Sequence, residues 1–461
     1  MSTLITISVL GIICLVLEIF NLRKIVVPFS LLALAGILGL NIAELAVGHS
    51  FLTIESYGML TESTSSKAFA SLFILLAFFI VLMSPKFYAD KIVKITDYVS
   101  LKIFLLAGAV AMISFGNLVM FFIGLEVLSI SAYILASSKP HSLRSNEAGM
   151  KYFLMGAVAS SFVLFGIALV YGTTASFDIG IVANLLLTNN VVSPTWILLG
   201  FIMLSLGMFF KMAIFPFHFW APDVYQGSPT LTTALMSTLV KVAAIGSFFF
   251  IASAFAPLIS GTMNLIIVIL SILTMTVGNI TALRQKNTKR MMAYSGISHA
   301  GFMLMLMTIA PAGSATVLYY AIAYSLASMA AFSVILSVCQ DTEDEDISNF
   351  YGLISHKPVI AGVLALALMS LGGIPILGGF FAKFFLFREM LSVGQVTLVI
   401  AGVINSIIAI YYYFGVINVM FTREKRVAQD MQIPIEYKIV AIGCTILNIA
   451  IGLWPSLVLD L

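Results

Sequence analysis

The stretch that decides the fold, residues 206–220, reads Leu-Gly-Met-Phe-Phe-Lys-Met-Ala-Ile-Phe-Pro-Phe-His-Phe-Trp. It places Lys211 near the middle of an apolar run long enough to cross a bilayer, with Pro216 shortly after it. Lys241 and Glu126 lie inside two further apolar runs. Burying one charge in hydrocarbon costs about 3 kcal/mol on insertion scales. A chain that keeps three such groups indicates a path for ions or protons through a membrane protein.

The composition extends this interpretation to the whole chain. Hydrophobic residues make up 61% of the 461 positions and charged residues 9%, whereas a soluble domain carries about 25% charged residues. The sequence therefore predicts an all-α polytopic membrane protein, embedded in a lipid bilayer, without a soluble domain or a nucleic-acid partner. The three cysteines have no metal-ligand spacing, and no flavin, haem, iron–sulfur or nucleotide motif is visible. We expect neither a cofactor nor a metal in this chain.

Fourteen apolar runs are long enough to span the hydrocarbon core, which needs about 20 residues per helix. The first run, about residues 4–21, is expected to be an uncleaved span because no basic residue precedes it and no small-residue cleavage site follows. Lys102 and Lys438 begin the fourth and fourteenth spans, and we expect both to snorkel.

The basic residues predict the orientation of the spans. The loops after even-numbered spans hold only Lys67, and the other loops hold fifteen basic residues. Basic loops stay in the cytoplasm, so both termini are predicted on the non-cytoplasmic side, and in a bacterium the chain is placed in the inner membrane. The fifteen are Arg23, Lys24, Lys86, Lys91, Lys94, Lys139, Arg144, Arg284, Lys286, Lys289, Arg290, Lys357, Arg423, Lys425 and Arg426.

Two spans contain helix breaks. Pro216 cannot donate an N–H, so the carbonyl of Met212 loses its helical partner. In the second stretch, 370–384, Pro375 frees the carbonyl of Leu371 in the same way. Within a bilayer, unpaired backbone is tolerated only where protein or water can satisfy it. Both breaks are therefore predicted to face a polar interior; their residues are Pro216, Gly372, Gly373 and Pro375.

The breaks recur at matching positions of two groups of five spans. The first break is in the fourth span of the group 4–8, and the second is in the fourth span of the group 9–13. Because five is odd, successive copies insert with opposite orientation, and paired interrupted helices in inverted halves point to a transport site. The predicted division is spans 1–3 in residues 1–99, the first repeat in 100–256, the second repeat in 257–422 and the last span in 423–461. Lys211 then corresponds to Lys383, and Glu126 to His299.

Three long motifs, residues 211–230, 289–302 and 372–384, resemble the antiporter-like membrane subunits of respiratory complex I and of Mrp-type cation/proton antiporters. Residues 235–243 read Leu-Met-Ser-Thr-Leu-Val-Lys-Val-Ala. With Lys241, this stretch looks like the N-type subunits of NADH:quinone oxidoreductase, whereas the sister L and M types usually carry a histidine-bearing version. The resemblance covers nearly the whole chain.

The resemblance implies a proton-translocating module that works beside the other membrane subunits of complex I, including its sister antiporter-like subunits. Flavin, iron–sulfur clusters and quinone are expected in those partners, and quinone reduction there would drive the protons. Glu126 looks like the glutamate that pairs with the lysine at position 211. The other implied residues of the proton path are Lys211, Lys241 at its centre, His299, Lys383 on the exit side, and Lys151, which matches a lysine of the N-type sixth span.

The mechanism that we hypothesise is an ion-pair switch. If Glu126 moves toward or away from Lys211, the proton affinity of the lysine changes, and its proton can pass by Lys241 and His299 to Lys383. Blander interpretations stay open: His299 as a satisfied core histidine, and Lys151 as an ordinary surface partner of a nearby glutamate. Two other functions also stay open, namely an Mrp-type antiporter subunit and a membrane scaffold that conducts nothing. The acidic segment 341–346 is expected to be a solvated loop, with a docking face for a basic partner as the alternative.

Overall fold

The computed structural model describes residues 2–48, 50–51, 56–89, 95–340, 344–422 and 432–460. The predicted topological residues Lys91, Lys94, Arg423, Lys425 and Arg426, and positions 341–343 of the acidic segment, lie outside these ranges. Within them the fold is almost entirely helical, as predicted, with three isolated β-bridges.

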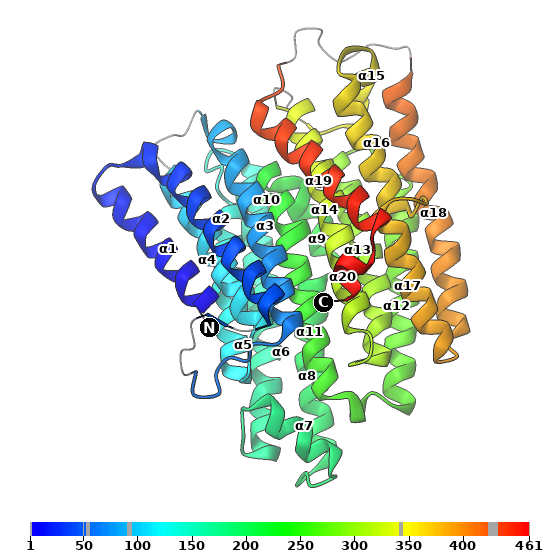
Figure 1. The fold of residues 1–461 in the computed structure, drawn as a ribbon. Helices are drawn as coiled ribbons and strands as arrows, with labels where there is room; N and C mark the ends of the chain where they lie inside the picture. The colour runs from blue at the N-terminus through cyan, green and yellow to red at the C-terminus, as the bar shows by residue number, and fades with distance from the viewer. Residues whose placement is uncertain are drawn as a thin grey trace.

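The helices follow the chain in the order shown in Figure 1. They are α1 (Ser2–Ile19), α2 (Arg23–Val47), α3 (Thr64–Phe87), α4 (Ile95–Ile113), α5 (Leu118–Ala136), α6 (Leu143–Thr174), α7 (Ile179–Leu187), α8 (Pro194–Met212), α9 (Trp220–Gly227), α10 (Thr230–Leu235), the π-helical turn η2 (Met236–Val240), α11 (Lys241–Ala254), α12 (Gly261–Ala282), α13 (Thr288–Met305), α14 (Ser314–Val338), α15 (Leu353–His356), α16 (Pro358–Gly372), α17 (Gly378–Ser392), α18 (Val396–Phe421), α19 (Ile435–Leu453) and α20 (Ser456–Leu459).

Thirteen helices in the described ranges are long and apolar enough to cross a membrane. The sequence predicts fourteen spans, and the difference lies at the second break, where α16 and α17 are each too short to count as a span. The predicted boundary at 99/100 falls inside α4, and the boundary at 256/257 falls between α11 and α12. The division into two inverted repeats stays a prediction.

The two breaks end their helices by different local means. After α8, Ala213 takes the left-handed conformation with φ 60°, and the N–H groups of Ala213 and Ile214 return to the carbonyls of Phe210 and Phe209. Pro216 follows this turn and cannot continue the helix. After α16, Gly373 has φ +89°, a conformation that L side chains rarely adopt. The glycine found there by sequence is thus required by the backbone.

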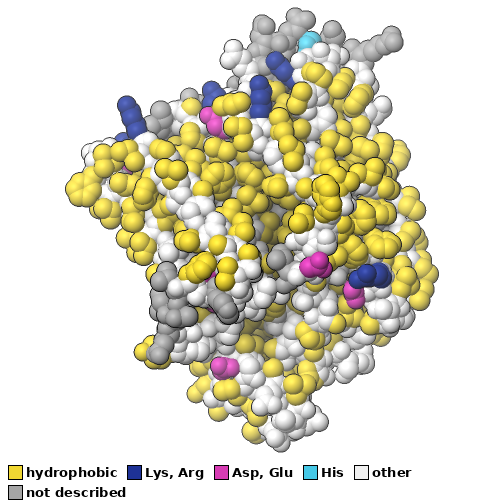
Figure 2. All heavy atoms as spheres, viewed as in Figure 1, with side chains coloured by type: hydrophobic (Ala, Val, Ile, Leu, Met, Phe, Trp, Pro, Cys, Tyr) yellow, Lys and Arg dark blue, Asp and Glu magenta, His cyan; other side chains and the backbone are white. Residues whose placement is uncertain are grey.

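Two helical units form the centre of the bundle. The continuous unit α10–η2–α11 and the long helix α14 are almost wholly buried, whereas only a minority of the residues of α1, α2 and α18 are buried. Figure 1 shows α11 and α14 inside the bundle, with α1 at one edge and α18 at the other. Figure 2 shows that Lys and Arg side chains gather along the upper rim of this face, above a broad hydrophobic belt. This distribution is that of a protein whose surrounding solvent is lipid.

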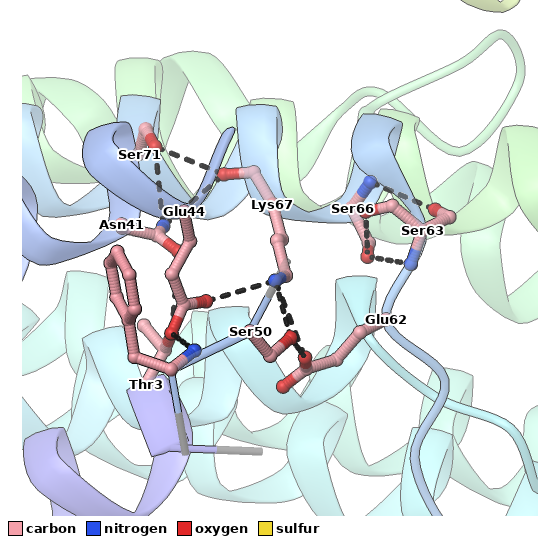
Figure 3. A network of polar contacts seen from close by, with 10 residues as sticks. Thr3, Asn41, Glu44, Ser50, Glu62, Ser63, Ser66, Lys67 and Ser71 are labelled. Atoms are coloured by element: carbon pink, nitrogen blue, oxygen red, sulfur yellow. Dashed lines mark hydrogen bonds and ion pairs between the residues drawn. The ribbon is translucent and has the colours of Figure 1, made fainter. Parts of the chain in front are cut away.

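A polar network fastens the exposed helix α2 to α3 (Figure 3). The Lys67 ammonium of α3 contacts the Glu44 carboxylate of α2 at 2.9 Å and donates to the Ser50 hydroxyl at 2.7 Å. The second Glu44 oxygen accepts the backbone N–H of Phe51 at 3.0 Å. Glu62 adds a second carboxylate, 3.5 Å from the same ammonium. Lys67 is the one basic residue that the sequence analysis places in the loops after even-numbered spans. It therefore has a structural partner within the chain.

Replacing Glu44 with alanine is expected to loosen α2. Removing one partner of a buried ion pair costs about 3 kcal/mol, because the other charge stays buried. The matched control is Glu18→Ala at the opposite end of the α1–α2 hairpin, where the pair with Arg23 is more exposed and is worth less than about 1 kcal/mol. Hydrogen exchange of the α2 amides in membranes measures both. Equal protection of α2 in the two variants would contradict this role of Glu44.

Candidate functional site

Lys211 lies in the last turn of α8 and is 3% exposed. Its ammonium donates to the Ser129 hydroxyl at 2.6 Å and to the Tyr133 hydroxyl at 2.9 Å, both on α5. It also faces the rings of Tyr133 and Tyr152, at 5.1 and 5.8 Å from their centroids. Tyr152 in turn stacks on Trp220, the first residue of α9. The ammonium is therefore held by neutral hydroxyls and aromatic faces.

Glu126 and Lys211 do not form the direct pair that the resemblance implies. No ion pair joins them in the described residues, and Oε1 of Glu126 is buried there without a hydrogen-bond partner. Glu126, Ser129 and Tyr133 lie at i, i+3 and i+7, so they share one face of α5. The carboxylate and the ammonium thus lie along the same face, with hydroxyls as the direct contacts. The spacing Glu-x-x-Ser-x-x-x-Tyr was the signal in the sequence that could have revealed Ser129 and Tyr133.

At the first break, an indole side chain donates a hydrogen bond to the backbone. Trp220 Nε1 donates to the carbonyl of Phe210 at 2.9 Å. The Phe210 carbonyl also accepts the backbone N–H of Ala213 at 3.0 Å, so the indole is its second donor. The carbonyl of Met212, which the proline was predicted to free, is not the one that the indole reaches. The backbone N–H of Phe215 is taken by the Thr274 hydroxyl of α12 at 3.1 Å. The break therefore lies among polar groups of neighbouring elements, as its proline predicts.

Lys241 begins α11 immediately after the π-helical turn η2. It is 2% exposed, and within the described part of the chain its Nζ has no hydrogen-bond partner. The ring of Tyr225 lies near the ammonium, with its centroid 5.7 Å from Nζ. Single π-helical turns inside membrane or soluble helices are frequent at functional sites. An ammonium buried without a partner requires polar groups or water nearby.

His299 of α13 is bonded on both ring nitrogens. Nδ1 lies 2.9 Å from the Tyr320 hydroxyl of α14, and Nε2 lies 3.4 Å from the Tyr413 hydroxyl of α18. The Tyr413 hydroxyl also bonds Ser295, one turn before the histidine. These partners come from helices 21 and 114 residues away, and the sequence carried no signal for them. His299 is thus a hydrogen-bonded histidine, and its part in proton transfer stays a proposal.

Lys383 donates hydrogen bonds to the backbone carbonyls at the second break. It is buried on α17 and donates to the carbonyls of Leu371 at 3.2 Å and Gly372 at 2.9 Å. The Leu371 carbonyl is the one that Pro375 was predicted to free. The Phe302 ring lies 5.1 Å below the ammonium. Lys211 and Lys383, which the predicted repeats place at corresponding positions, have different partners: hydroxyls for Lys211 and backbone carbonyls for Lys383.

Lys151 lies apart from the buried lysines. Its side chain is 43% exposed and contacts Glu147 at 2.7 Å and Asp223 at 3.3 Å. Asp223 also binds Arg290 at 2.7 Å. Glu147, Lys151 and Asp223 border a cleft of about 210 Å³ between α6 and α9. Within this chain, Lys151 therefore belongs to a partly exposed cluster of charged side chains.

Lys102 is a buried lysine that the sequence analysis placed wrongly. It was expected to snorkel, but it is 1% exposed. Its ammonium donates to the Ser84 hydroxyl at 2.7 Å and lies 4.7 Å from the centroid of the Tyr88 ring. The position of Lys102 in the second turn of α4 suggested an interfacial location. Packing of α3 over that turn buries it instead.

Within the described residues 344–346 the acidic segment is partly attached to the bundle: Asp344 is exposed, as expected of a solvated loop, whereas the Glu345 side chain is only 17% exposed and is held by partners. Glu345 contacts the Lys289 ammonium at 2.8 Å and accepts from the Thr230 hydroxyl at 2.8 Å. Asp344 pairs with Arg144 of α6. The segment does meet basic residues, but they belong to the same chain. The segment thus connects α13 to α6 and α10.

No cluster of three His, Cys, Asp or Glu able to hold a metal occurs in the described ranges.

A family model described as NADH:quinone oxidoreductase/Mrp antiporter, TM, matches residues 116–409. The chain is 52% identical to NADH-quinone oxidoreductase subunit N of Flavobacterium johnsoniae over 468 residues, which covers 100% of both chains. The chain belongs to this family. The predicted resemblance is thereby confirmed.

Two solved structures share the fold. A chain of respiratory complex I from Thermus thermophilus matches with a TM-score of 0.84 and 29% identity, covering 99% of this chain and 98% of that one. A chain of the Mrp complex from Dietzia sp. DQ12-45-1b matches with a TM-score of 0.85 over 100% and 95% of the chains. The latter is 19% identical, so it shows similarity of fold alone.

The attachment of the acidic segment is expected to depend on pH. Burial raises the pKa of the Glu345 carboxyl, but the charge of the Lys289 ammonium and its hydrogen bond together lower the pKa by a larger amount. The pKa therefore lies below its ordinary value of 4.5. A carboxyl with a lowered folded-state pKa stabilises the fold above its unfolded pKa, and this stabilisation is lost as pH falls through the folded value.

Hydrogen exchange of residues 344–350, corrected for the intrinsic effect of pH, is the measurement. Protection should be constant from neutral pH down to the ordinary carboxyl range and fall only in more acidic solution. Glu345→Gln should lower the protection at neutral pH and remove most of its pH dependence. A midpoint above the ordinary carboxyl range would contradict the assignment.

Proposed function

We propose that this chain is a proton-translocating membrane subunit of an NADH:quinone oxidoreductase. The observation that carries the proposal is the set of buried ammonium groups of Lys211, Lys241 and Lys383, which are 3%, 2% and 6% exposed. None of them contacts a carboxylate in the described part of the chain. Intramembrane ionisable residues that face a protein interior mark ion and proton paths.

The partners of these lysines suit groups that gain and lose protons. A salt bridge would hold an ammonium in its charged form, whereas hydroxyls and carbonyls bind it more weakly. Lys211 has two hydroxyl partners, and Lys383 has two carbonyl partners. Neither arrangement requires the lysine to stay protonated, because a neutral amine still donates hydrogen bonds.

Glu126 supplies the electrostatic bias. At an effective dielectric constant of about 20, moving a carboxylate from about 8 Å to about 4 Å of an ammonium changes its energy by about 2 kcal/mol. Moving one proton against 100 mV costs about 2.3 kcal/mol. A rearrangement that brought the Glu126 carboxylate closer to Lys211 by this amount would therefore be worth about one such step.

The energy must come from elsewhere in the assembly. We propose that the flavin, the iron–sulfur clusters and the quinone reside in partner subunits, and that quinone reduction there drives the switch. The name of the Flavobacterium relative and the complex I match support this assembly. The basic rim is proposed to face the cytoplasm of a bacterial cell, with the chain in the inner membrane and both termini on the other side.

Lys211→Ala is expected to abolish NADH-driven acidification of inverted vesicles and to lower NADH oxidation in parallel, because the coupled path loses a proton carrier. Glu126→Gln should reduce both rates. The matched control is Lys438→Ala, an exposed lysine on the spanning helix α19, which should retain both. Wild-type rates in an assembled Lys211→Ala complex would overturn the proposal, and acidification driven by a sodium gradient without NADH would indicate an antiporter instead.

A further inference from the structure

The helix α19 lies outside both predicted groups of five spans, and its residue Asn448 contacts the backbone at the second break. Asn448 is 3% exposed and uses both ends of its side-chain amide. Its Oδ1 accepts from the Ser370 hydroxyl of α16 at 2.8 Å and from the backbone N–H of Gly378, the first residue of α17, at 3.3 Å. Its Nδ2 donates to the carbonyl of Ala323 in α14 at 2.9 Å. One buried amide therefore joins both halves of the broken helix to a central helix.

The backbone of α19 also lies directly against the break. A Cβ on Gly452 would overlap the carbonyl oxygen of Ile376 and lie 2.9 Å from the nitrogen of Gly378. Ile376 has φ 80°, in the left-handed region that a β-branched residue rarely adopts. A conformation of this kind persists only where the surrounding structure imposes it. The close approach of α19 is a restraint of that kind.

The first break has an equivalent contact. There the N–H of Phe215 is taken by the Thr274 hydroxyl of α12 at 3.1 Å. The helix α12 follows the first predicted group of five spans, as α19 follows the second. In both cases the helix after the group supplies an acceptor for a backbone N–H at the break, namely Thr274 and Asn448. This correspondence gives α19 a role that its place outside the predicted repeats did not suggest.

The backbone held in this way carries the partners of Lys383. The ammonium donates to the carbonyls of Leu371 and Gly372, which directly follow Ser370. The Ser370 hydroxyl, which donates to α19, also accepts the N–H of Gly379 at 3.1 Å and so spans the break. Carbonyl oxygens that point at an ammonium favour its charged form. The orientation of these two carbonyls therefore influences how strongly Lys383 holds a proton.

Few other charges act on Lys383. His299 of α13 is a titratable side chain that interacts with it electrostatically. Of the helices packed against α17, α14, α16 and α18 have no charged side chain, and tyrosines are the titratable groups of α14 and α18. The charged residues of α17 and α19 lie more than one turn along their helices from Lys383 and Asn448: Arg388, Glu389, Glu436 and Lys438. A changed pH response in a variant of α19 therefore reports on the carbonyls that hold the ammonium.

We propose that Asn448 is a positioning residue for Lys383. Its amide fixes the backbone across the second break, and that backbone presents two carbonyls to the ammonium. The inference rests on the proposed function, and it adds α19 to the elements that set the proton affinity of the last lysine in the proposed path.

The test uses Asn448→Leu in the assembled complex, which keeps the approximate size of the side chain and removes both ends of the amide. The matched control is Tyr319→Phe, which removes a different hydrogen bond between α14 and α19, from the Tyr319 hydroxyl to the Ile451 carbonyl at 2.8 Å. NADH-driven acidification and NADH oxidation are measured in inverted vesicles from neutral to alkaline pH. Both rates are divided by the amount of assembled complex.

Asn448→Leu is expected to lower turnover and to change its pH dependence. A misplacement of about 1 Å can slow a step by about 100-fold, so turnover should fall several-fold or more. An ammonium that loses its carbonyl partners gives up its proton at lower pH, so the alkaline limb of the pH profile should move down by about one pH unit. Tyr319→Phe should keep the wild-type profile.

Ser370→Ala is the second variant, because it removes the hydroxyl between Asn448 and Gly379 and adds no bulk. It should shift the alkaline limb in the same direction by a smaller amount, and it decides the case if Asn448→Leu does not assemble. A pH profile that matches that of Tyr319→Phe, with or without a lower turnover, would overturn the positioning role while Lys383→Ala still abolishes pumping. If Lys383→Ala itself pumps normally, the proposed function loses its last lysine, and the inference fails with it.

Discussion

The structure depends on one requirement of the bilayer, that every backbone polar group find a partner inside the protein. Both broken helices end at carbonyls that accept hydrogen bonds from side chains. At the first break the Trp220 indole takes the Phe210 carbonyl. At the second, the Lys383 ammonium takes the carbonyls of Leu371 and Gly372. Sealing the backbone therefore also fixes where the ionisable and aromatic groups of the site lie.

The three buried lysines of the proposed path differ in what surrounds them. Lys211 has hydroxyl partners, Lys241 has none in the described ranges, and Lys383 has carbonyls. Such a series gives each ammonium a different degree of stabilisation without a fixed counter-ion. In the proposed path, a charge that moves nearby would shift the proton along the series, because no carboxylate of the described residues pairs with any of the three. A cluster of permanent salt bridges would resist that shift.

The units α10–η2–α11 and α14 bring several groups of the proposed path to the centre of the bundle. Lys241 follows the π-helical turn of the first unit, and Tyr320 and Tyr324 are one turn apart on the second. Both units are buried almost completely, so their polar groups face one another and not lipid. The exposed helices at the edge need separate fastening, which the Glu44–Lys67 pair provides for α2. The acidic segment likewise links α13 to α6 and α10 through Glu345 and Asp344.

Sequence by itself determined the class, the spans, the two breaks and the family, because each depends on local composition or on contiguous motifs. A proline ends a helix and an apolar run inserts in lipid whatever the rest of the chain does. The tertiary structure decided which groups meet. It gave Lys211 the hydroxyls of Ser129 and Tyr133 as partners, buried Lys102, and brought Tyr413 to His299 from 114 residues away. These contacts depend on how helices rotate and pack against one another, and no local pattern in the sequence specifies that rotation.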